Sequence, residues 1–178
     1  MTTHRPSPCS LPQGEGESDH AHVTVIEICE PALTFARSLG TRLRAHRGAA
    51  LFIDYGPERS SPGDSLQALC DGGPADPLSE PGTADLTAHV DFAAFAATAH
   101  DTGAATYGPL PQGIFLTRLG LFQRTDRLAR NQPPARAAAL IDAARRLVEP
   151  NRMGRLFKVL AVCQPDCLPL PGFESDPS

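Results

Sequence analysis

The hydrophobic positions of the chain alternate between strand-like and helix-like segments over residues 21–163. Residues 23–28 are mostly β-branched, which predicts a strand. Residues 49–53 form a continuous apolar run that ends in a polar residue and a turn, which predicts a strand buried on both faces of a parallel sheet. Two further strands are expected at 104–107 and 156–163.

Helical spacing of apolar residues predicts the segments between these strands. A first helix follows Pro31 and carries apolar residues through Leu43. A second helix begins at Asp91, whose side chain can cap it, and ends at Gly103. Further helical patterns cover residues 65–69, 114–121 and 135–148. The alternation of strands and helices predicts an α/β fold.

Proline and glycine mark three segments outside this pattern. Residues 1–20 and 164–178 are rich in proline and poor in large hydrophobic residues, so we expect disordered tails there. Residues 57–85 combine Pro, Gly, Ser and Asp. A loop of this length inside a compact domain is a lid, an insertion or a disordered segment.

Charge and apolar content exclude several classes of partner. The 16 Lys and Arg residues are outnumbered by 20 Asp and Glu residues, and the resulting net charge of -4 disfavours nucleic acid. No apolar run reaches the length that spans a membrane. Residues 1–22 lack the apolar run of a targeting leader, and the five scattered cysteines suit reduced thiols. These features predict a cytoplasmic protein without a membrane partner.

Candidate chemistry lies at a strand end and at a helix start. Asp54 and Tyr55 follow the apolar strand, where parallel sheets gather their functional residues. Asp85, His89 and Asp91 form a polar cluster that could act as a general acid and base set. Alternatively, they are a loop-to-helix junction in which Asp91 caps the helix and Asp85 forms a turn. The composition favours the junction.

No metal site is predicted. His20 and His22 would share one face of a strand, but no third ligand stands at a suitable spacing. Cys163 and Cys167 lack the second pair of ligands that a zinc site needs, so we expect free thiols at both positions.

Several blocks of the sequence resemble the MidA-like family of S-adenosylmethionine-dependent methyltransferases, which includes a mitochondrial complex I assembly factor that methylates an arginine. The blocks occur in the family's order and together cover about residues 21–163. They are Gly48–Gly56, Ser65–Leu69, Asp76–Leu78, Pro81–Phe92, Gln112–Leu116, Leu119–Gly120 and Met153–Leu160. The block that contains Asp85–Phe92 is the most specific of them.

The resemblance implies a class I methyltransferase fold, S-adenosylmethionine as the cofactor and a protein substrate with a target arginine. Residues 49–54 would be the fifth strand of the family's sheet, and 104–107 with 156–163 its closing pair. By position in the family, three carboxylates lie on the substrate and lid side: Asp54, Asp85 and Asp91. The substrate pocket would include Tyr55, Thr87, His89 and Gln112.

The family's cofactor equipment is expected upstream of these blocks. The glycine-rich turn after the first strand, the acidic residue that holds the ribose and an Asn-Glu segment have no counterpart in this sequence. Where the family usually has a basic residue and a histidine, this chain has Cys70–Gly73. We therefore expect the C-terminal half of a methyltransferase domain, with an incomplete Rossmann-like sheet.

Three functional hypotheses follow from this incompleteness. The first is a methyltransferase-family chain that is inactive by itself. The second is one half of a split enzyme that a separate N-terminal half completes. The third is a non-catalytic interaction module that binds a partner by strand addition to an exposed sheet edge.

Overall fold

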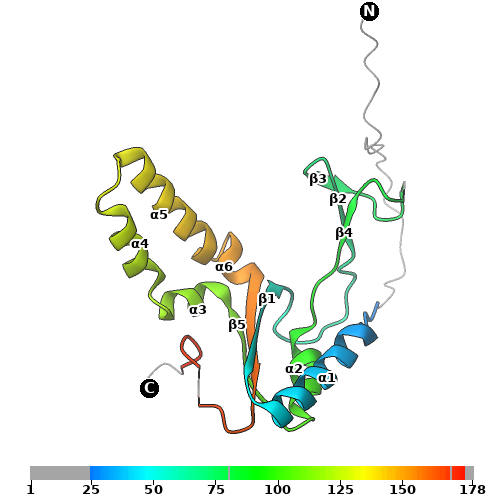
Figure 1. Cartoon of the computed structure of the whole chain (residues 1–178). Coiled ribbons are helices and arrows are strands. Elements are labelled where there is room, and N and C mark those ends of the chain that lie inside the picture. The colour runs from blue at the N-terminus through cyan, green and yellow to red at the C-terminus, as the bar shows by residue number, and fades with distance from the viewer. Residues whose placement is uncertain (1–24, 80, 169, 175–178) are drawn as a thin grey trace, which may run out of the picture. The chain divides into compact units, whose positions relative to one another are not determined.

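The computed structural model describes residues 25–79, 81–168 and 170–174, which divide into two compact units. The smaller unit contains Ser61–His89 and the described residues before Cys29, and the larger unit contains Cys29–Ser60 and the described residues from Val90 onward. Figure 1 labels the helices and strands of both units.

The larger unit is built on a three-stranded sheet with the order β1-β6-β5. Strands β1 (Ala49–Tyr55) and β5 (Ala105–Pro111) both pair antiparallel with the central strand β6 (Phe157–Cys163). The two outer strands therefore run in the same direction, and their carboxyl ends lie at the same edge of the sheet (Figure 1). We call this edge the carboxyl edge.

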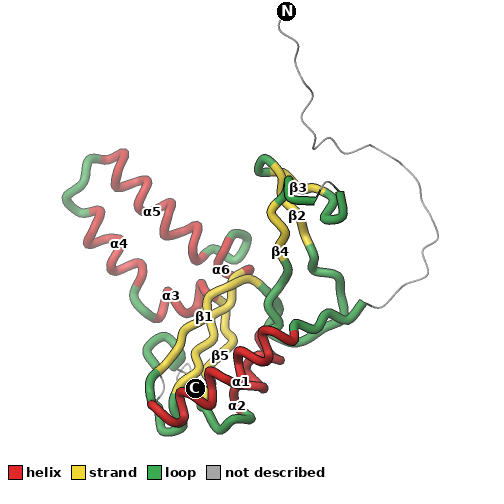
Figure 2. Tube along the Cα trace, turned by 45° about the vertical axis from the view of Figure 1, so that its right-hand side comes forward, coloured by secondary structure: helices red, strands yellow, loops and turns green. Residues whose placement is uncertain are grey.

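Helices α1 (Glu30–His46) and α2 (Phe92–His100) cover one face of the sheet, beside each other in both views (Figure 2). Their apolar stripes meet Leu160 and Val162 of β6, which are fully buried. The rings of Phe52 and Phe95 pack with centroids 4.9 Å apart. Burial of these aromatic and aliphatic side chains supplies the main driving force for the unit.

Four helices connect β5 to β6: α3 (Gln112–Arg118), α4 (Leu121–Ala129), α5 (Pro134–Val148) and the short α6 (Met153–Leu156). Helices α4 and α5 lie side by side as a hairpin in both views (Figures 1 and 2). Helices α3 and α5 confirm the helical patterns at 114–121 and 135–148. Helix α4 was missing from the predicted series.

A segment of the predicted C-terminal tail packs against the opposite face of the sheet. The Tyr107 hydroxyl donates a hydrogen bond to the Cys167 carbonyl over 2.6 Å. The Phe173 ring contacts the rings of Phe115 and Tyr107, with centroids 5.2 and 6.2 Å away. Arg47 forms an ion pair with Asp166 at 2.8 Å. The described part of residues 164–174 therefore belongs to the packed structure, because its aromatic and polar groups find partners on β5, on α3 and at the end of α1.

The smaller unit is an antiparallel sheet with the order β3-β2-β4, formed by β2 (Gln67–Cys70), β3 (Gly73–Ala75) and β4 (Asp85–Thr87). The helix predicted at 65–69 is therefore wrong, and the region predicted as one long loop holds three strands. The two residues between β2 and β3, Asp71 and Gly72, both have positive φ, at 51° and 78°. An Asp-Gly pair is a strong signal for a tight hairpin turn, which fixes this pairing.

Two strand predictions need correction. Residues 25–28 form no strand, and residues 23 and 24 lie outside the described residues. The strand at 49–53 exists, but it is not buried on both faces, since Leu51 is 50% and Ile53 45% exposed. Its partner β6 is antiparallel, and its other edge pairs with no strand among the described residues.

The predicted reduced state of the cysteines holds at three described positions and fails at one. Cys29, Cys163 and Cys167 are free thiols, whereas Cys70 is disulfide-bonded. The scattered spacing on which the prediction rested carries no information about which cysteines approach one another in space.

Gly56 allows β1 to approach the start of α2. A Cβ atom at this position would lie 2.1 Å from the Val90 carbonyl oxygen, which is a backbone atom and cannot move aside alone. We expect Gly56→Ala to lower the free energy of unfolding by about 1–3 kcal/mol, as overpacking does in close-packed sites. Urea denaturation measures the change. Gly73→Ala is the matched control, because its Cβ would make an ordinary contact at 3.8 Å, and equal losses for both variants would contradict the clash.

Burial and hydrogen bonding to the Cys167 thiol raise the pKa of Cys163 to about 12. In the unfolded chain this thiol loses its proton near pH 8.5, so the folded state binds more protons between about pH 9 and 12. The free energy of unfolding should therefore fall as pH rises through this range, by up to about 1.4 kcal/mol per pH unit from this group. Denaturation at several pH values should show a flatter slope for Cys163→Ala than for Cys29→Ala. Identical slopes for the two variants would exclude the effect.

Candidate functional site

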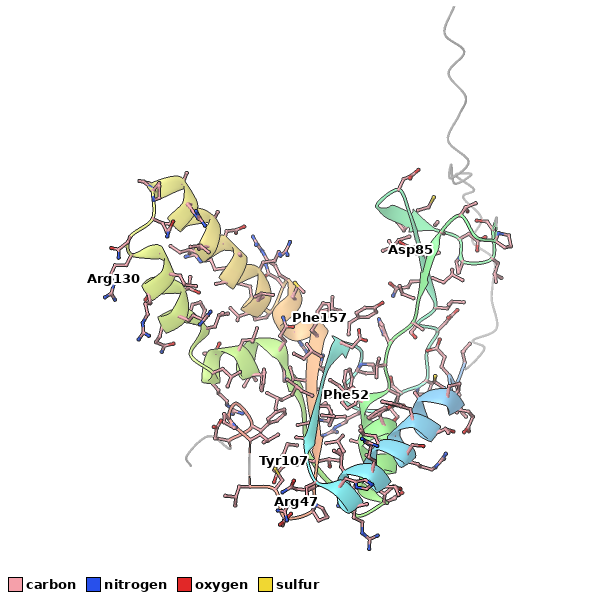
Figure 3. All side chains as sticks on the ribbon, in the orientation of Figure 1. Arg47, Phe52, Asp85, Tyr107, Arg130 and Phe157 are labelled. Atoms are coloured by element: carbon pink, nitrogen blue, oxygen red, sulfur yellow. The ribbon has the colours of Figure 1, made fainter. Side chains whose placement is uncertain are left out.

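The carboxyl edge of the larger unit carries the first pair of predicted site residues. Asp54 is exposed, and its Oδ1 accepts a hydrogen bond from the Tyr55 backbone N–H over 2.8 Å. The Tyr55 ring packs edge-on against Phe157, whose centroid lies 5.7 Å away. Figure 3 places Phe157 at the carboxyl edge. The strand thus fixes the backbone of this pair, and the Asp54 carboxylate stays accessible.

An apolar cavity of about 190 Å³ adjoins Asp54. Residues from β1, β6 and the first turns of α1 and α2 line it, and Asp54 is the charged side chain among them. The lining consists of Ala32, Phe52, Ile53, Asp54, Val90, Phe92, Phe95 and Leu160. Ligand sites usually have volumes of about 300–1,000 Å³, so this cavity is large enough for part of a ligand of cofactor size.

The Asp91 side chain caps the start of α2. Its Oδ1 accepts hydrogen bonds from the Ala94 backbone N–H over 2.9 Å and from the Ser60 hydroxyl over 2.8 Å. This is the N-cap role that the sequence offered as one of two alternatives, because the first amide groups of a helix lack partners within it. The carboxylate is therefore engaged in structure.

Gln112 lies at the carboxyl end of β5, at the same edge of the sheet as Asp54. The residue is 5% exposed, and its side-chain Nε2 donates to the Leu147 carbonyl over 2.8 Å. This hydrogen bond ties the start of α3 to the end of α5. The side chain of Gln112 therefore holds α3 in position. Gln112 lines neither the cavity at Asp54 nor a second cavity beside α3.

That second cavity, of about 480 Å³, lies between α3, the end of α5 and α6. Gly113 and Gly154 allow these elements to approach, since a Cβ atom at either position would come within 2.5 Å of the Val148 carbonyl oxygen. The lining is Pro111, Gly113, Ile114, Thr117, Arg118, Val148, Pro150, Gly154 and Arg155. No feature of the sequence predicted this cavity, although both glycines fall in blocks of the resemblance.

Asp85, Thr87 and His89 belong to the smaller unit. Asp85 and Thr87 lie on β4 opposite Leu69 and Gln67 of β2, and Figure 3 labels Asp85 on this sheet. The His89 backbone N–H donates to the Ser65 hydroxyl oxygen over 3.0 Å. The seven predicted site residues therefore fall into two sets. Asp85, Thr87 and His89 lie in the smaller unit, and Asp54, Tyr55, Asp91 and Gln112 lie in the larger unit.

Ser65 also organises an acidic group in the smaller unit. Its hydroxyl and backbone N–H both donate to the Glu27 carboxylate, over 2.5 and 3.0 Å. These hydrogen bonds, the hydroxyl first, hold the pKa of Glu27 below its usual range. Glu27 was not predicted as a site residue, and its place in a segment predicted as a strand gave no signal for this contact.

Metal binding and membrane insertion find no support among the described residues. In the part of the chain that the structure describes, no three His, Cys, Asp or Glu side chains converge as metal ligands would. His20 and His22 lie outside that part. Within the same residues, no helix has both the length and the apolar content to cross a membrane.

Comparison with known proteins identifies the family. Residues 7–110 match the family model described as "Putative S-adenosyl-L-methionine-dependent methyltransferase". The chain belongs to this methyltransferase family. The expected family membership is thereby confirmed, and S-adenosylmethionine is the cofactor of the family.

Curated relatives of this methyltransferase-family chain carry a more specific name. It is 32% identical over 162 residues to the mitochondrial protein arginine methyltransferase NDUFAF7 of Danio rerio, covering 91% of this chain and 37% of the relative. It is 33% identical over 138 residues to the NDUFAF7 of Homo sapiens, covering 77% of this chain and 31% of that protein. The chain thus spans about a third of the length of these relatives.

Two crystal structures from Burkholderia thailandensis share its fold. One, of a COG1565 superfamily protein, superposes with a TM-score of 0.67 at 29% identity, covering 81% of this chain and 40% of that one. The other is a COG1565 superfamily member bound to S-adenosyl-homocysteine, with a TM-score of 0.65 at 29% identity over 79% of this chain and 38% of that one. The α/β architecture of the methyltransferase-family chain is therefore confirmed.

The capping role of Asp91 can be tested by substitution. If capping is its role, Asp91→Ala should lower the free energy of unfolding by about 1 kcal/mol, while Asp91→Ser, which keeps a capping oxygen, should lose much less. Thermal denaturation followed by circular dichroism measures both variants. Equal losses for Ala and Ser would show that the hydrogen bond to Ala94 does not stabilise the helix.

Proposed function

We propose that this chain forms the substrate-side part of an S-adenosylmethionine-dependent methyltransferase domain that acts on an arginine of a protein substrate. We further propose that the chain by itself holds the cofactor too weakly for methyl transfer. The observation that carries the proposal is the position of the accessible Asp54 carboxylate at the carboxyl edge of a family-specific α/β sheet. In open α/β sheets, ligands bind beyond the carboxyl ends of the strands.

The names of the relatives support the substrate class. The curated relatives are protein arginine methyltransferases, and a solved relative holds S-adenosyl-homocysteine, the product that methyl transfer leaves. Because this chain covers 37% or less of the two curated relatives described above, their activity comes to it only as a proposal. The cytoplasmic location stays a prediction from sequence composition, and the names of those relatives place them in mitochondria.

Asp54 is the residue that we propose to hold the substrate arginine. A carboxylate binds a guanidinium through two charge-assisted hydrogen bonds, which fix its plane and orient the nitrogen that receives the methyl group. The aromatic ring of Tyr55 would form a wall beside it. The roles of Asp85, Thr87 and His89, which lie in the smaller unit, stay predictions from the family resemblance. Asp91 and Gln112 act on the positions of α2 and α3.

Neither of the two cavities described above fits the whole cofactor. The cavity at Asp54 has about 190 Å³, below the usual range for such ligands. The larger cavity is lined by Arg118 and Arg155 and by no acidic residue, which does not suit a ribose and a cationic sulfonium. Among the described residues, no strand is followed by a glycine-rich turn into a helix, the usual cradle for a nucleotide.

Calorimetric titration of the purified chain with S-adenosylmethionine tests this proposal. We expect no saturable binding below the millimolar range, because the cavities leave most of the cofactor in water. S-adenosyl-homocysteine, which lacks the positive sulfonium charge, serves as the control ligand and should behave in the same way. A micromolar Kd for either compound would contradict the proposed dependence on further structure.

The free edge of β1 favours a second candidate, an interaction module. Among the described residues no strand pairs with this edge, which makes it a template for another strand, and Leu51 and Ile53 on one face of β1 are half-exposed. A separate half of a split enzyme and a non-catalytic partner would both use this edge. The two cases differ in cofactor binding, because only the complex of a split enzyme should bind S-adenosylmethionine in the same titration.

A further inference from the structure

The segment that connects β5 to β6 is strongly basic, although the chain as a whole is acidic. Residues 118–155 contain nine arginines and three acidic residues, a net charge of +6. Since the whole chain has a net charge of -4, the remaining residues together carry -10. Positive charge is therefore concentrated in one region of the larger unit. We call helices α4 and α5 with their connection, Leu121–Val148, the basic hairpin.

Three arginines of the basic hairpin form a row along α4. Arg124, Arg127 and Arg130 follow at three-residue spacing, which brings them to one side of the helix, and all three are exposed. Thr125 is 7% exposed and belongs to the side that packs on α5. Figure 3 shows Arg130 at the end of α4 where the chain turns toward α5. The row therefore faces solvent.

The acidic residues nearby do not neutralise this row. Asp142 and Glu149 both pair with Arg152, at 3.2 Å each. Asp126 is the remaining acidic residue of the segment, and the structure gives it no ion pair with the row. Like charges at this spacing repel one another and destabilise a helix. An anionic partner would relieve that repulsion.

We propose that the basic hairpin docks an acidic segment of a partner protein. A guanidinium matches a carboxylate through two parallel hydrogen bonds, and the chain's basic residues are Arg at 15 of 16 positions. A short acidic segment can bind the basic hairpin without contacting other parts of the chain. A long phosphate polymer or an anionic membrane is disfavoured by the net charge of -4 of the whole chain. The proposal does not depend on methyl transfer.

Binding of a fluorescent 15-residue poly-glutamate peptide to the full chain tests this surface. We expect the triple variant Arg124→Gln, Arg127→Gln, Arg130→Gln to weaken binding about tenfold at low salt, as the loss of three exposed ion pairs implies. Glutamine has a helix propensity close to that of arginine, so α4 should persist. Fluorescence anisotropy gives the Kd, and circular dichroism checks the helix content.

A matched variant separates local docking from net charge. Arg37→Gln, Arg42→Gln, Arg59→Gln removes three exposed arginines from elsewhere in the larger unit, and its Kd should change less than twofold. Equal weakening by both triple variants would overturn the proposal, as would absence of peptide binding. Tighter, hairpin-dependent binding of a 20-base-pair DNA duplex or of phosphatidylserine vesicles would also overturn it. The readout uses no cofactor, so its failure is distinct from failure of the proposed methyltransferase role.

Discussion

The pairing of β6 with both of its neighbours is the constraint on which the larger unit depends. Strands β1 and β5 make no ladder with each other, and each is held by antiparallel hydrogen bonds to β6. The central strand is buried along nearly its whole length, with Val159 to Cys163 at 0% exposed. Among the described strands, β6 comes last in the sequence. The sheet is complete only when β1 and β5, which are far apart in sequence, have both paired with it. The carboxyl edge with Asp54 is a product of that long-range pairing.

The same arrangement leaves β1 as an edge strand. Its inner side chains, such as Phe52, meet α1 and α2, whereas Leu51 and Ile53 on the other face are half-exposed. The C-terminal segment covers β5 on that face through Phe173 and Cys167. An apolar strand with a free edge and one open face is a liability for aggregation unless something covers it. Covering this edge and this face of β1 would remove that liability.

The sequence predicted the larger unit better than the smaller one because its signals are of different kinds. Helices α1 and α5 have helical apolar periodicity and strands β1 and β6 are nearly continuous apolar runs, and all four were predicted. The hairpin of the smaller unit depends on two turn residues, Asp71 and Gly72. Their signal for a hairpin was obscured by the helical spacing of apolar residues at 65–69. The strand expected at 23–28 failed at its described residues, because β-branched residues favour extended backbone without specifying a pairing partner. Helix α4 was missed although its apolar residues Leu121, Phe122, Leu128 and Ala129 recur at helical spacing.

Site residues could be predicted by position but not by role. Asp54 and Asp91 are both carboxylates next to the first or last residue of a regular element, and sequence alone does not distinguish them. The structure separates them by their hydrogen bonds. Asp91 accepts from a helix amide and a serine hydroxyl, so binding a substrate would cost it those partners. Asp54 accepts from its own neighbour and remains exposed, so it can bind a guanidinium without giving up a structural contact. This difference in hydrogen bonding is why the proposed role in substrate binding falls on Asp54, whereas Asp91 stabilises the start of α2.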